Sequence, residues 1–255
     1  MPTALITGAT AGLGAEFARQ LAASGHDLVI VARDTARLEA TQKSITDEFG
    51  GKVDVLPADL TTDAGCIAVA DRIADAQRPV DLLVNNAGFG MYQVFGTGAL
   101  EAEERQLDLN VRAVLRLAHA AVRAMTGRGN GRIINVSSVA GFVPRGSNAT
   151  YSAGKAWVTM FSEALSVQLR GSGVTVTAIC PGFTRTEFHE RAHADMSHVP
   201  ERMWLDASDV VREGLADAFD GKPVSVPSRQ YRSLVTAVRL IPRPLLRRIM
   251  ARRAF

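Results

Sequence analysis

Short apolar runs alternate with helix-length segments along most of this chain, and that alternation constrains its fold more than any other feature. The runs have the length of buried strands, and the segments between them carry apolar residues at helical spacing. Such a pattern favours a parallel sheet with helices on both faces, so we expect an α/β fold with a single doubly wound sheet of about seven strands. The predicted strands are 4–7, 28–32, 53–56, 82–85, 132–137, 174–179 and 224–226, and the predicted helices are 13–24, 35–49, 63–77, 101–126, 151–170 and 208–220.

The length of 255 residues fits one large α/β domain or two small ones, and no linker, repeat or low-complexity segment divides the chain. We expect one domain over residues 1–227, followed by a tail over residues 228–255. No apolar run reaches the ~18 residues of a membrane-spanning helix, and residues 1–8 lack the charged region of a secretory signal. Cys66 and Cys180 lie far apart without metal-ligand spacing, so we expect free thiols in a reducing compartment, the cytoplasm.

The net charge of +3 is unevenly distributed. Residues 228–255 hold eight arginines and no acidic residue, so the rest of the chain is net acidic. A nucleic-acid-binding domain usually carries a basic patch, and the basicity here belongs to the tail instead. The tail lacks the aromatic platforms on which bases stack. We therefore expect no nucleic-acid partner.

The tail carries two apolar stripes at helical spacing, within residues 231–241 and 245–250, which Pro242 and Pro244 separate. Its arginines lie off these stripes. Arginine-rich amphipathic helices bind anionic membrane surfaces, so one hypothesis places the protein at the inner face of a membrane. The alternative is that the tail packs on its own domain or on a second subunit and closes the pocket, and we favour this alternative slightly.

A glycine-rich turn, Thr7-Gly8-Ala9-Thr10-Ala11-Gly12-Leu13-Gly14, follows the first predicted strand and opens the first predicted helix. Glycines in such a turn allow a sharp bend, close approach of the backbone to a pyrophosphate, and close packing of the helix on the strand. The helix N-terminus then presents free N–H groups and a favourable dipole to the phosphates. We expect a dinucleotide to bind here, at Gly8, Thr10, Gly12, Leu13 and Gly14. The alternative is a glycine-rich turn that binds nothing.

The spacing G-x-x-x-G-x-G occurs together with Asn85-Asn86-Ala87-Gly88, Ser138, Tyr151-x-x-x-Lys155 and Pro181-Gly182. In this combination and order, the chain resembles the single-domain branch of the short-chain dehydrogenase/reductases over roughly residues 3–226. The resemblance implies a Rossmann-type sheet, a nicotinamide cofactor, and hydride transfer between a carbonyl and a secondary alcohol. It also implies that Asp59 and Leu60 flank the adenine, and that Asn86, Ala87 and Gly88 line the cofactor cleft.

The end of the second predicted strand indicates which nicotinamide nucleotide is bound. An NAD site places an acid there for the ribose hydroxyls, whereas this chain has Ala32 followed by Arg33. A guanidinium suits a 2′-phosphate, so we expect NADP(H) with Arg33 as its anchor, and Arg37 can add charge. Asp34 is the objection to this assignment, and its alternative role is the N-cap of the following helix. Ala11 leaves the turn without the basic residue that some NADP-binding relatives carry there.

Tyr151 and Lys155 are four residues apart on a predicted helix and therefore share a face. Ser138 follows a predicted strand, and doubly wound sheets bind ligands at the carboxyl ends of their strands. A free tyrosine has a pKa of about 10, and a nearby lysine cation lowers it toward neutrality. Tyr151 is then the acid/base, Lys155 tunes it and binds the ribose, and Ser138 holds the substrate oxygen. By resemblance, Asn110 holds a water that connects the lysine to solvent. The alternative for the Tyr-x-x-x-Lys pair is an exposed pair on a surface helix.

The segment after the sixth predicted strand is expected to cover cofactor and substrate. By resemblance, Pro181 and Gly182 cover the nicotinamide and Thr186 binds its carboxamide, while Thr184 stands where an apolar residue is more usual. Residues 183–206 form the expected lid, and its apolar side chains suit a lipid-, steroid- or aromatic-type substrate. The alternative is that they only pack the lid onto the domain. They are Phe188, Met196, Met203, Trp204 and Leu205, with Phe89, Met91, Tyr92 and Phe142 opposite.

His189 and His193 are four residues apart, with His198 nearby, and such a pair on a helix can bind zinc. No carboxylate or cysteine pattern completes a site. The proposed chemistry needs no metal, so we expect none.

These inferences predict an NADP(H)-dependent oxidoreductase, a ketoreductase acting on a small hydrophobic carbonyl or alcohol. One alternative is a non-catalytic nucleotide-sensing or scaffold protein with the same fold, and the intact Ser138, Tyr151, Lys155 and Asn110 argue against it. Another is epimerisation or dehydration, but such relatives usually carry an acid near the glycine motif or a longer substrate domain.

By resemblance we expect a homodimer or homotetramer built on helices 101–126 and 151–170. Gly154, where relatives often have serine, can permit close approach of the cofactor or of a neighbouring backbone.

Overall fold

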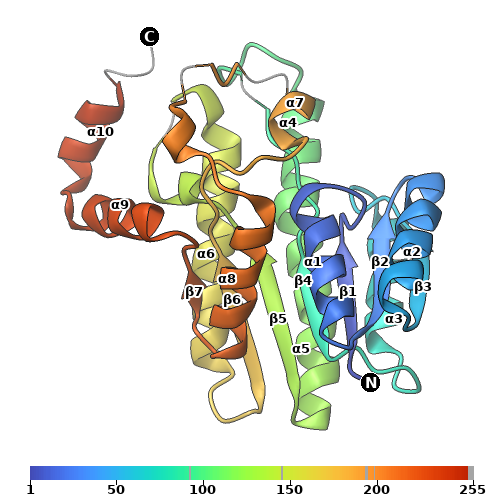
Figure 1. The fold of residues 1–255 in the computed structure, drawn as a ribbon. Coiled ribbons are helices and arrows are strands. Elements are labelled where there is room, and N and C mark those ends of the chain that lie inside the picture. The colour runs from blue at the N-terminus through green and yellow to red at the C-terminus, as the bar shows by residue number, and fades with distance from the viewer. Residues whose placement is uncertain (92, 145, 193–194, 198, 252–255) are drawn as a thin grey trace.

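The computed structural model describes residues 1–91, 93–144, 146–192, 195–197 and 199–251. Its strands form one parallel seven-stranded sheet in the order β3-β2-β1-β4-β5-β6-β7 (Figure 1), which confirms the predicted doubly wound fold. The strands are β1 (Thr3–Thr7), β2 (Asp27–Ala32), β3 (Val53–Pro57), β4 (Leu82–Asn85), β5 (Gly131–Val136), β6 (Val174–Ile179) and β7 (Val224–Ser225).

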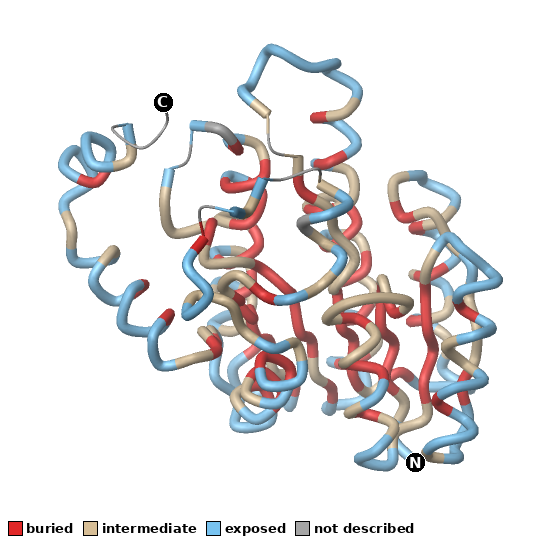
Figure 2. The backbone as a smooth tube through the Cα atoms, turned by 45° about the horizontal axis from the view of Figure 1, so that its top comes forward, coloured by how far each residue is buried: buried red, intermediate tan, exposed pale blue. Residues whose placement is uncertain are grey.

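Helices cover both faces of the sheet, with α1 (Gly12–Ala23), α2 (Thr35–Phe49) and α8 (Ala207–Phe219) on one face and α3 (Asp63–Ala74), α5 (Ala113–Arg128) and α6 (Ala149–Gln168) on the other. Because successive residues of a strand point to opposite faces, Ile6 belongs to the first apolar core and Leu5 to the second. Figure 2 shows the central strands buried and the outer sides of the helices exposed. Burial on both faces explains why these strands read as continuous apolar runs.

The predicted helix 101–126 is interrupted. It consists of α4 (Leu100–Leu107), one π-helical turn over Asp108–Arg112, and α5. A π turn inserts a residue into the helical ladder, shifts the facing of the side chains around it, and is frequent at functional sites. The shorter elements are three 3₁₀ turns, at Val139–Phe142, Gly146–Asn148 and Glu201–Met203, and the short helix α7 (Phe188–Arg191).

The strand order reverses between β1 and β4, so the loops after these strands diverge and leave a crevice at their carboxyl ends. The glycine turn lies at this crevice. Gly8 and Gly12 have φ angles of 69° and 51°, in the left-handed region that favours glycine. A Cβ atom at Gly14 would lie 2.0 Å from the carbonyl oxygen of Gly8, so only glycine lets α1 pack this closely on β1.

The tail forms two helices, α9 (Arg229–Leu240) and α10 (Arg243–Ala251), and the chain turns between them at Ile241 and Pro242. In Figure 1 they extend along the β7 side of the domain. Tyr231 anchors α9, since only 1% of it is exposed. No helix among the described residues is long and apolar enough to cross a bilayer.

Candidate active site

A cavity of about 1520 Å³ opens at the carboxyl ends of the strands. The glycine turn, the ends of β2, β4 and β5, the lid and the tail line it. All but one of the residues predicted to bind the cofactor border it, namely Gly8, Thr10, Gly12, Leu13, Arg33, Asp59, Leu60, Asn86, Ala87, Gly88, Tyr151, Lys155, Pro181, Gly182, Thr184 and Thr186. Gly14 is the exception, because it lies beneath the turn against Gly8.

Asn86 joins the glycine turn to β4. Its side-chain Nδ2 donates to the carbonyl oxygens of Thr7 at 2.9 Å and Gly8 at 3.3 Å. The Thr7 hydroxyl oxygen in turn accepts from the backbone N–H groups of Asn86 and Ala87, both at 3.0 Å. A Cβ atom at Gly8 would lie 3.0 Å from Ala87 Cα. The turn is therefore a narrow backbone-lined cradle at a helix N-terminus, which fits the pyrophosphate of a dinucleotide.

Arg33 lies exposed at the rim of the cavity, directly after β2. Asp34 is the N-cap of α2, and its carboxylate accepts a hydrogen bond from the Arg37 backbone N–H at 3.0 Å. A carboxylate that caps a helix accepts hydrogen bonds from backbone N–H groups, and Asp34 therefore already has a partner other than a ribose hydroxyl. The objection that Asp34 raises against NADP(H) is therefore weakened.

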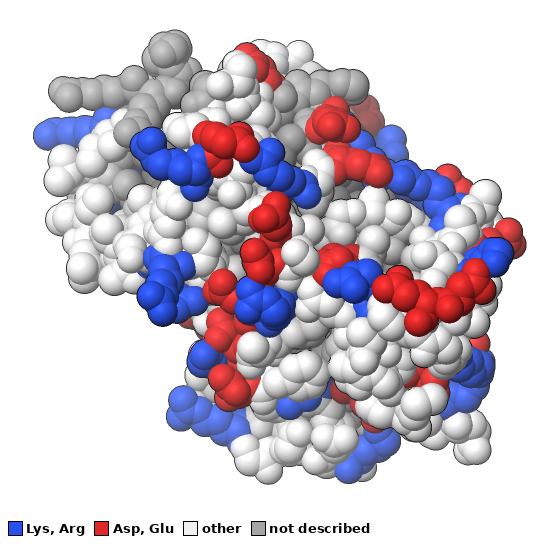
Figure 3. Space-filling model, viewed as in Figure 1, with Lys and Arg blue, Asp and Glu red and all other residues white. Residues whose placement is uncertain are grey.

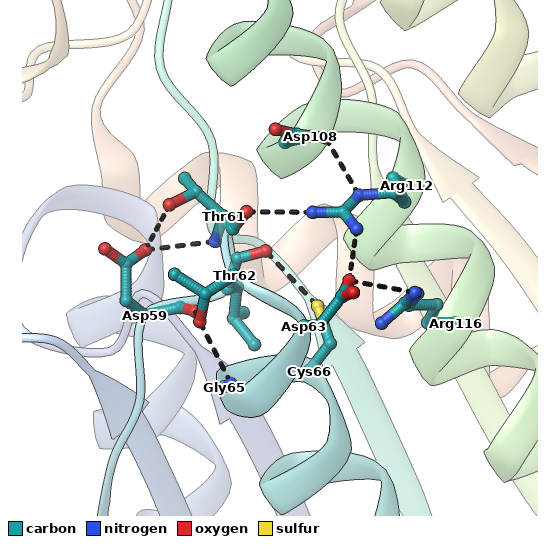
Figure 4. Close-up of polar contacts among 10 residues, drawn as sticks. Asp59, Thr61, Thr62, Asp63, Gly65, Cys66, Asp108, Arg112 and Arg116 are labelled. Atoms are coloured by element: carbon teal, nitrogen blue, oxygen red, sulfur yellow. Dashed lines mark hydrogen bonds and ion pairs between the residues drawn. The ribbon is translucent and has the colours of Figure 1, made fainter.

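The loop after β3 is held in shape by hydrogen bonds, which Figure 4 shows. The Asp59 carboxylate accepts from the Thr61 N–H at 3.0 Å and from its hydroxyl at 2.8 Å. Burial opposes ionisation of Asp59, but these two hydrogen bonds, together with the positive charges of Arg33 and Arg105, hold its pKa below the ordinary value. Arg112, at the end of the π turn, donates to the Thr61 carbonyl oxygen at 2.8 Å and pairs with Asp63. The π turn thus fixes the loop that would flank the adenine.

Ser138, Tyr151 and Lys155 line the same cavity. The Lys155 ammonium donates to the Val136 carbonyl oxygen at 2.8 Å and lies 5.7 Å from the centroid of the Tyr151 ring. Burial lowers the pKa of Lys155 to about 8. Ser138 caps the following 3₁₀ turn, where its hydroxyl oxygen accepts from the Ala140 N–H at 3.1 Å. The structure therefore brings these three predicted side chains together.

Asn110 lies just behind the cavity wall. Its Nδ2 donates to the Phe89 carbonyl oxygen at 2.8 Å, and its Oδ1 accepts from the Phe89 N–H at 3.1 Å. A Cβ atom at Gly88 would lie 2.9 Å from Asn110 Oδ1 and 3.6 Å from Lys155 Nζ, so both side chains flank Gly88. The π turn gives Asn110 this orientation, and no residue pattern in the sequence indicates that turn.

Gly154 lies on α6 one residue before Lys155. Among the described residues, a Cβ atom there would meet only Val111 Cγ2 within 4 Å, at 3.3 Å, and no backbone of a neighbouring element. Of the two alternatives for Gly154, the approach of a neighbouring backbone is not seen in the part of the chain that the structure describes, and the approach of the cofactor remains.

The lid reaches across to the glycine turn. A Cβ atom at Gly12 would lie 3.0 Å from Thr186 Cβ. Thr184 is buried and donates from its hydroxyl to the Gly182 carbonyl oxygen at 3.1 Å, which satisfies its polar group where an apolar residue is more usual. Phe188 packs on Tyr151 with ring centroids 5.9 Å apart.

Only some of the apolar side chains predicted for the substrate side line the cavity. Phe188, Met203, Phe89, Met91 and Phe142 do, with Phe183. Met196, Trp204 and Leu205 do not border it, and Trp204 instead packs on Phe183 with ring centroids 5.8 Å apart. The alternative that these apolar side chains pack the lid onto the domain therefore fits the ones that do not line the cavity.

Several predicted positions lie outside the described residues, namely Tyr92, His193 and His198, as does the side chain of His189. Among the described residues, no cluster of three or more histidine, cysteine or carboxylate side chains could hold a metal ion.

The tail forms a wall of the cavity, as predicted by the alternative in which it packs on its own domain and closes the pocket. Leu234, Val235 and Val238 of α9 and Leu246 and Ile249 of α10 border it. The helical spacing of these residues was visible in the sequence, but spacing alone left a membrane, a second subunit and the chain's own domain as alternatives.

The family model for short chain dehydrogenases matches residues 2–197. A ketoacyl reductase, HetN, from a Nostoc strain is 34% identical over 71% of this chain, and the matched region spans 63% of that relative. The solved structure of a short-chain dehydrogenase from Sphingobium yanoikuyae in complex with NADPH is 37% identical, with a TM-score of 0.86, and the match covers 94% of each chain. A bulky-bulky ketone specific alcohol dehydrogenase from Comamonas testosteroni is 31% identical, with a TM-score of 0.81, over 95% of this chain and 96% of that one.

Proposed function

The chain belongs to the short-chain dehydrogenase family, an oxidoreductase family acting on carbonyl and alcohol groups, and from that premise we propose that it interconverts an apolar ketone and its secondary alcohol with NADP(H). The observation that carries the proposal is that Ser138, Tyr151 and Lys155 border one cavity with the glycine turn. The domain over residues 1–227 holds all of these groups, and the tail over 228–255 borders the same cavity.

The nicotinamide, when bound, supplies or accepts the hydride. In the reducing direction, the Tyr151 hydroxyl gives its proton to the carbonyl oxygen as that oxygen gains charge. The Lys155 cation favours the phenolate that remains, and the Ser138 hydroxyl donates a hydrogen bond to the same substrate oxygen. Asn110 flanks Gly88 together with Lys155, a place from which it can hold a water that connects Lys155 to solvent. Through this connection Lys155 can pass a proton to the Tyr151 phenolate and regain one from the water.

The preference for NADP(H) rests on charge at the cavity rim. Arg33 and Arg37 both border the cavity next to the end of β2, and Asp34 is engaged by the α2 N-terminus. Paired guanidinium donors suit a 2′-phosphate. The NADPH complex of the Sphingobium relative supports this choice.

The preference for an apolar substrate rests on the side chains around Tyr151. Phe89, Phe142, Phe188 and Met203 line the cavity, and the Phe188 ring packs on the Tyr151 ring. Such a lining favours a lipid-, steroid- or aromatic-type substrate. The ketone specificity of the Comamonas relative supports a wide site.

The family resemblance favours a homodimer or homotetramer in the cytoplasm. Large apolar side chains on α5 and α6 remain exposed in the single chain, among them Leu115, Met160 and Val167. Exposed apolar faces on long helices are typical of subunit contacts. Size-exclusion chromatography with light scattering tests this expectation, and a monomer would contradict it.

The tail keeps its two alternatives. Its apolar stripes face the cavity of its own domain, which favours packing there, while Arg243, Arg247 and Arg248 are exposed and suit an anionic membrane surface. Pelleting with anionic vesicles, for the whole chain and for residues 1–227, tests membrane contact. Equal binding by both would remove the tail from that role.

Thermal unfolding with NADPH and with NADH tests the proposed function. At ~100 times its dissociation constant a ligand stabilises by about 2.7 kcal/mol, which raises the Tm by several degrees. We expect a shift with NADPH and turnover of apolar ketones. In Tyr151→Phe the turnover should be lost while the NADPH shift remains. No shift with either nucleotide, reduced or oxidised, would favour the non-catalytic alternative.

A further inference from the structure

The cavity continues beyond the catalytic side chains, between the tail and the 3₁₀ turn that follows Ser138. α9 packs on this turn, and the Arg239 guanidinium lies 4.8 Å from the centroid of the Phe142 ring. The glycine turn and Arg33 line the same cavity from the β1 and β2 side of the sheet, where the dinucleotide is expected, whereas α9 and α10 lie on the β7 side (Figure 1). The space along the tail is therefore on the substrate side of the reacting carbon.

Tyr231 holds the tail firmly in this place. Its hydroxyl donates to the Met203 carbonyl oxygen at 2.8 Å and accepts from the Phe183 N–H at 3.1 Å. A Cβ atom at Gly182 would lie 2.1 Å from Tyr231 Cζ, so the ring packs directly on the loop expected over the nicotinamide. The tail is thereby tied to both the cofactor loop and the lid.

The wall that the tail presents is apolar and incompletely covered. Leu234 and Ile249 line the cavity and are still 46% and 37% exposed, whereas Val235 and Leu246 are buried. Half-exposed apolar side chains that face a cavity gain free energy when an apolar ligand covers them. The cavity of about 1520 Å³ also exceeds the ~300–1000 Å³ of an ordinary single-ligand pocket, so it has room for a substrate beside the cofactor.

The row of cavity-lining residues on the tail is long enough to contact an extended alkyl chain, and is longer than a small ring compound requires. The cavity-lining residues of α9 extend from Tyr231 to Val238 and continue to Ile241, and ten residues of helix rise about 15 Å. α10 then adds Leu246 and Ile249 to the same lining. An extended alkyl chain would contact these positions one after another.

We propose that α9 and α10 form a chain subsite, and that the substrate is a ketone or secondary alcohol with a long alkyl chain that lies along the tail. The inference rests on the proposed function and adds the substrate class and the residues that measure its length. Val238 and Ile249 determine specificity here, since they contact the chain and not the reacting carbonyl.

The first experiment uses 2-alkanones from 2-butanone to 2-dodecanone with NADPH and the full chain. Each buried methylene is worth about 0.8 kcal/mol, or roughly fourfold. We therefore expect kcat/KM to rise up to about fourfold per methylene until the subsite is filled. A kcat/KM that does not depend on chain length would overturn the proposal.

The second experiment shortens the subsite. Val238→Trp and, separately, Ile249→Trp should lower kcat/KM for 2-dodecanone at least tenfold and leave 2-butanone within about twofold. The matched control is Leu240→Trp, because Leu240 is on α9, is 80% exposed and does not line the cavity. Equal losses for short and long ketones in both variants, or the same loss in the control, would contradict the subsite.

A binding measurement separates this proposal from the proposed function. Calorimetric titration of the protein with 2-dodecanol and 2-butanol needs no turnover. Tighter binding of 2-dodecanol, weakened in Val238→Trp and in Ile249→Trp, supports the subsite even in a protein that reduces no ketone. Failure of 2-dodecanol to bind more tightly than 2-butanol removes the subsite even from an active reductase.

Discussion

The Glu187 carboxylate, at the start of the short lid helix α7, accepts a hydrogen bond from the Arg37 guanidinium on α2 at 3.0 Å. Arg191 pairs with the same carboxylate from one turn further along α7. Hydrogen bonding to Arg37 holds the pKa of Glu187 below its ordinary value, so Glu187 is a carboxylate at neutral pH. Acidic and basic side chains lie next to one another across the face shown in Figure 3. The ion pair between Arg37 and Glu187 joins the lid to the rim of the cavity where a 2′-phosphate is expected.

Replacing Glu187 by glutamine should tighten NADPH binding. The carboxylate occupies Arg37 and repels a phosphate at the same rim, and a unit charge at ~4 Å in water is worth about 1 kcal/mol, or roughly fivefold in Kd. We expect the Kd of NADPH to fall by about that factor and the Kd of NADH to stay unchanged, as measured by calorimetry. Glu190→Gln, an exposed position on the same helix, is the control. An equal change for both nucleotides would show that Glu187 acts on the lid alone.

Replacing Arg33 by glutamine should reduce the preference for NADPH. A hydrogen bond to a charged group is worth about 1.5–3 kcal/mol, so the Kd of NADPH should rise roughly 10- to 100-fold while that of NADH stays within about twofold. Fluorescence titration with both nucleotides measures this. Arg19→Gln, on the exposed side of α1, keeps the same change in charge and should alter neither Kd. A rise in both Kd values for Arg33→Gln would mean that Arg33 binds a portion of the nucleotide that NADPH and NADH share, and not the 2′-phosphate.

The buried Lys155 cation lowers the free energy of unfolding of the protein at neutral pH, although the proposed reaction needs that cation. Burial lowers its pKa from 10.5 to about 8, so from pH 8 to pH 10.5 the unfolded chain binds more protons than the folded one. The contribution of Lys155 to the free energy of unfolding therefore rises as the pH rises from 8 to 10.5. That contribution is lost again as the pH falls toward 8. At neutral pH the folded protein holds a buried cation that burial disfavours.

Lys155→Met should be inactive and, at pH 7, roughly 1–3 kcal/mol more stable than the unmodified protein, after allowing for the hydrogen bond lost to Val136. This advantage should shrink as the pH rises from 8 to 10.5. Urea unfolding at several pH values measures it, with Lys43→Met on the exposed surface as the control. A variant less stable at every pH would show that the Lys155 cation is compensated by other contacts.

The sequence predicted the strands within one or two residues, because strands buried on both faces leave an unmistakable apolar run. It also predicted which side chains meet at Ser138, Tyr151 and Lys155, since parallel strands bring their carboxyl ends to one edge. It did not predict the π turn at Asp108–Arg112, because the hydrogen bonds between the Asn110 side chain and the Phe89 backbone favour that turn and arise only in the folded chain.

The position of the tail was predicted only as one of several alternatives. Its helical stripes were visible, but an amphipathic stripe looks the same whether it faces a membrane, a second subunit or its own domain. The hydrogen bonds of Tyr231 to Met203 and Phe183 decide the orientation, and they join residues far apart in sequence. Local pattern therefore predicted the helices and not what they cover.

Two glycines give a last prediction, because the space around them differs. At Gly14 a Cβ atom would lie 2.0 Å from the Gly8 carbonyl oxygen, and backbone cannot yield without moving α1 from β1. At Gly154, of the residues that the structure describes, a Cβ atom would meet only the Val111 side chain, at 3.3 Å. Gly14→Ala should cost about 1–3 kcal/mol and lower the Tm by roughly 3–10 °C.

Gly154→Ala should instead raise the Tm by up to roughly 4 °C with turnover retained, because alanine is about 1 kcal/mol better than glycine within a helix. Calorimetric melting of both variants beside the unmodified protein measures the difference. A lowered Tm for Gly154→Ala, with turnover intact, would mean that Val111 cannot shift by the few tenths of an ångström required. Loss of turnover with an unchanged Tm would mean instead that the bound cofactor needs the space at Gly154.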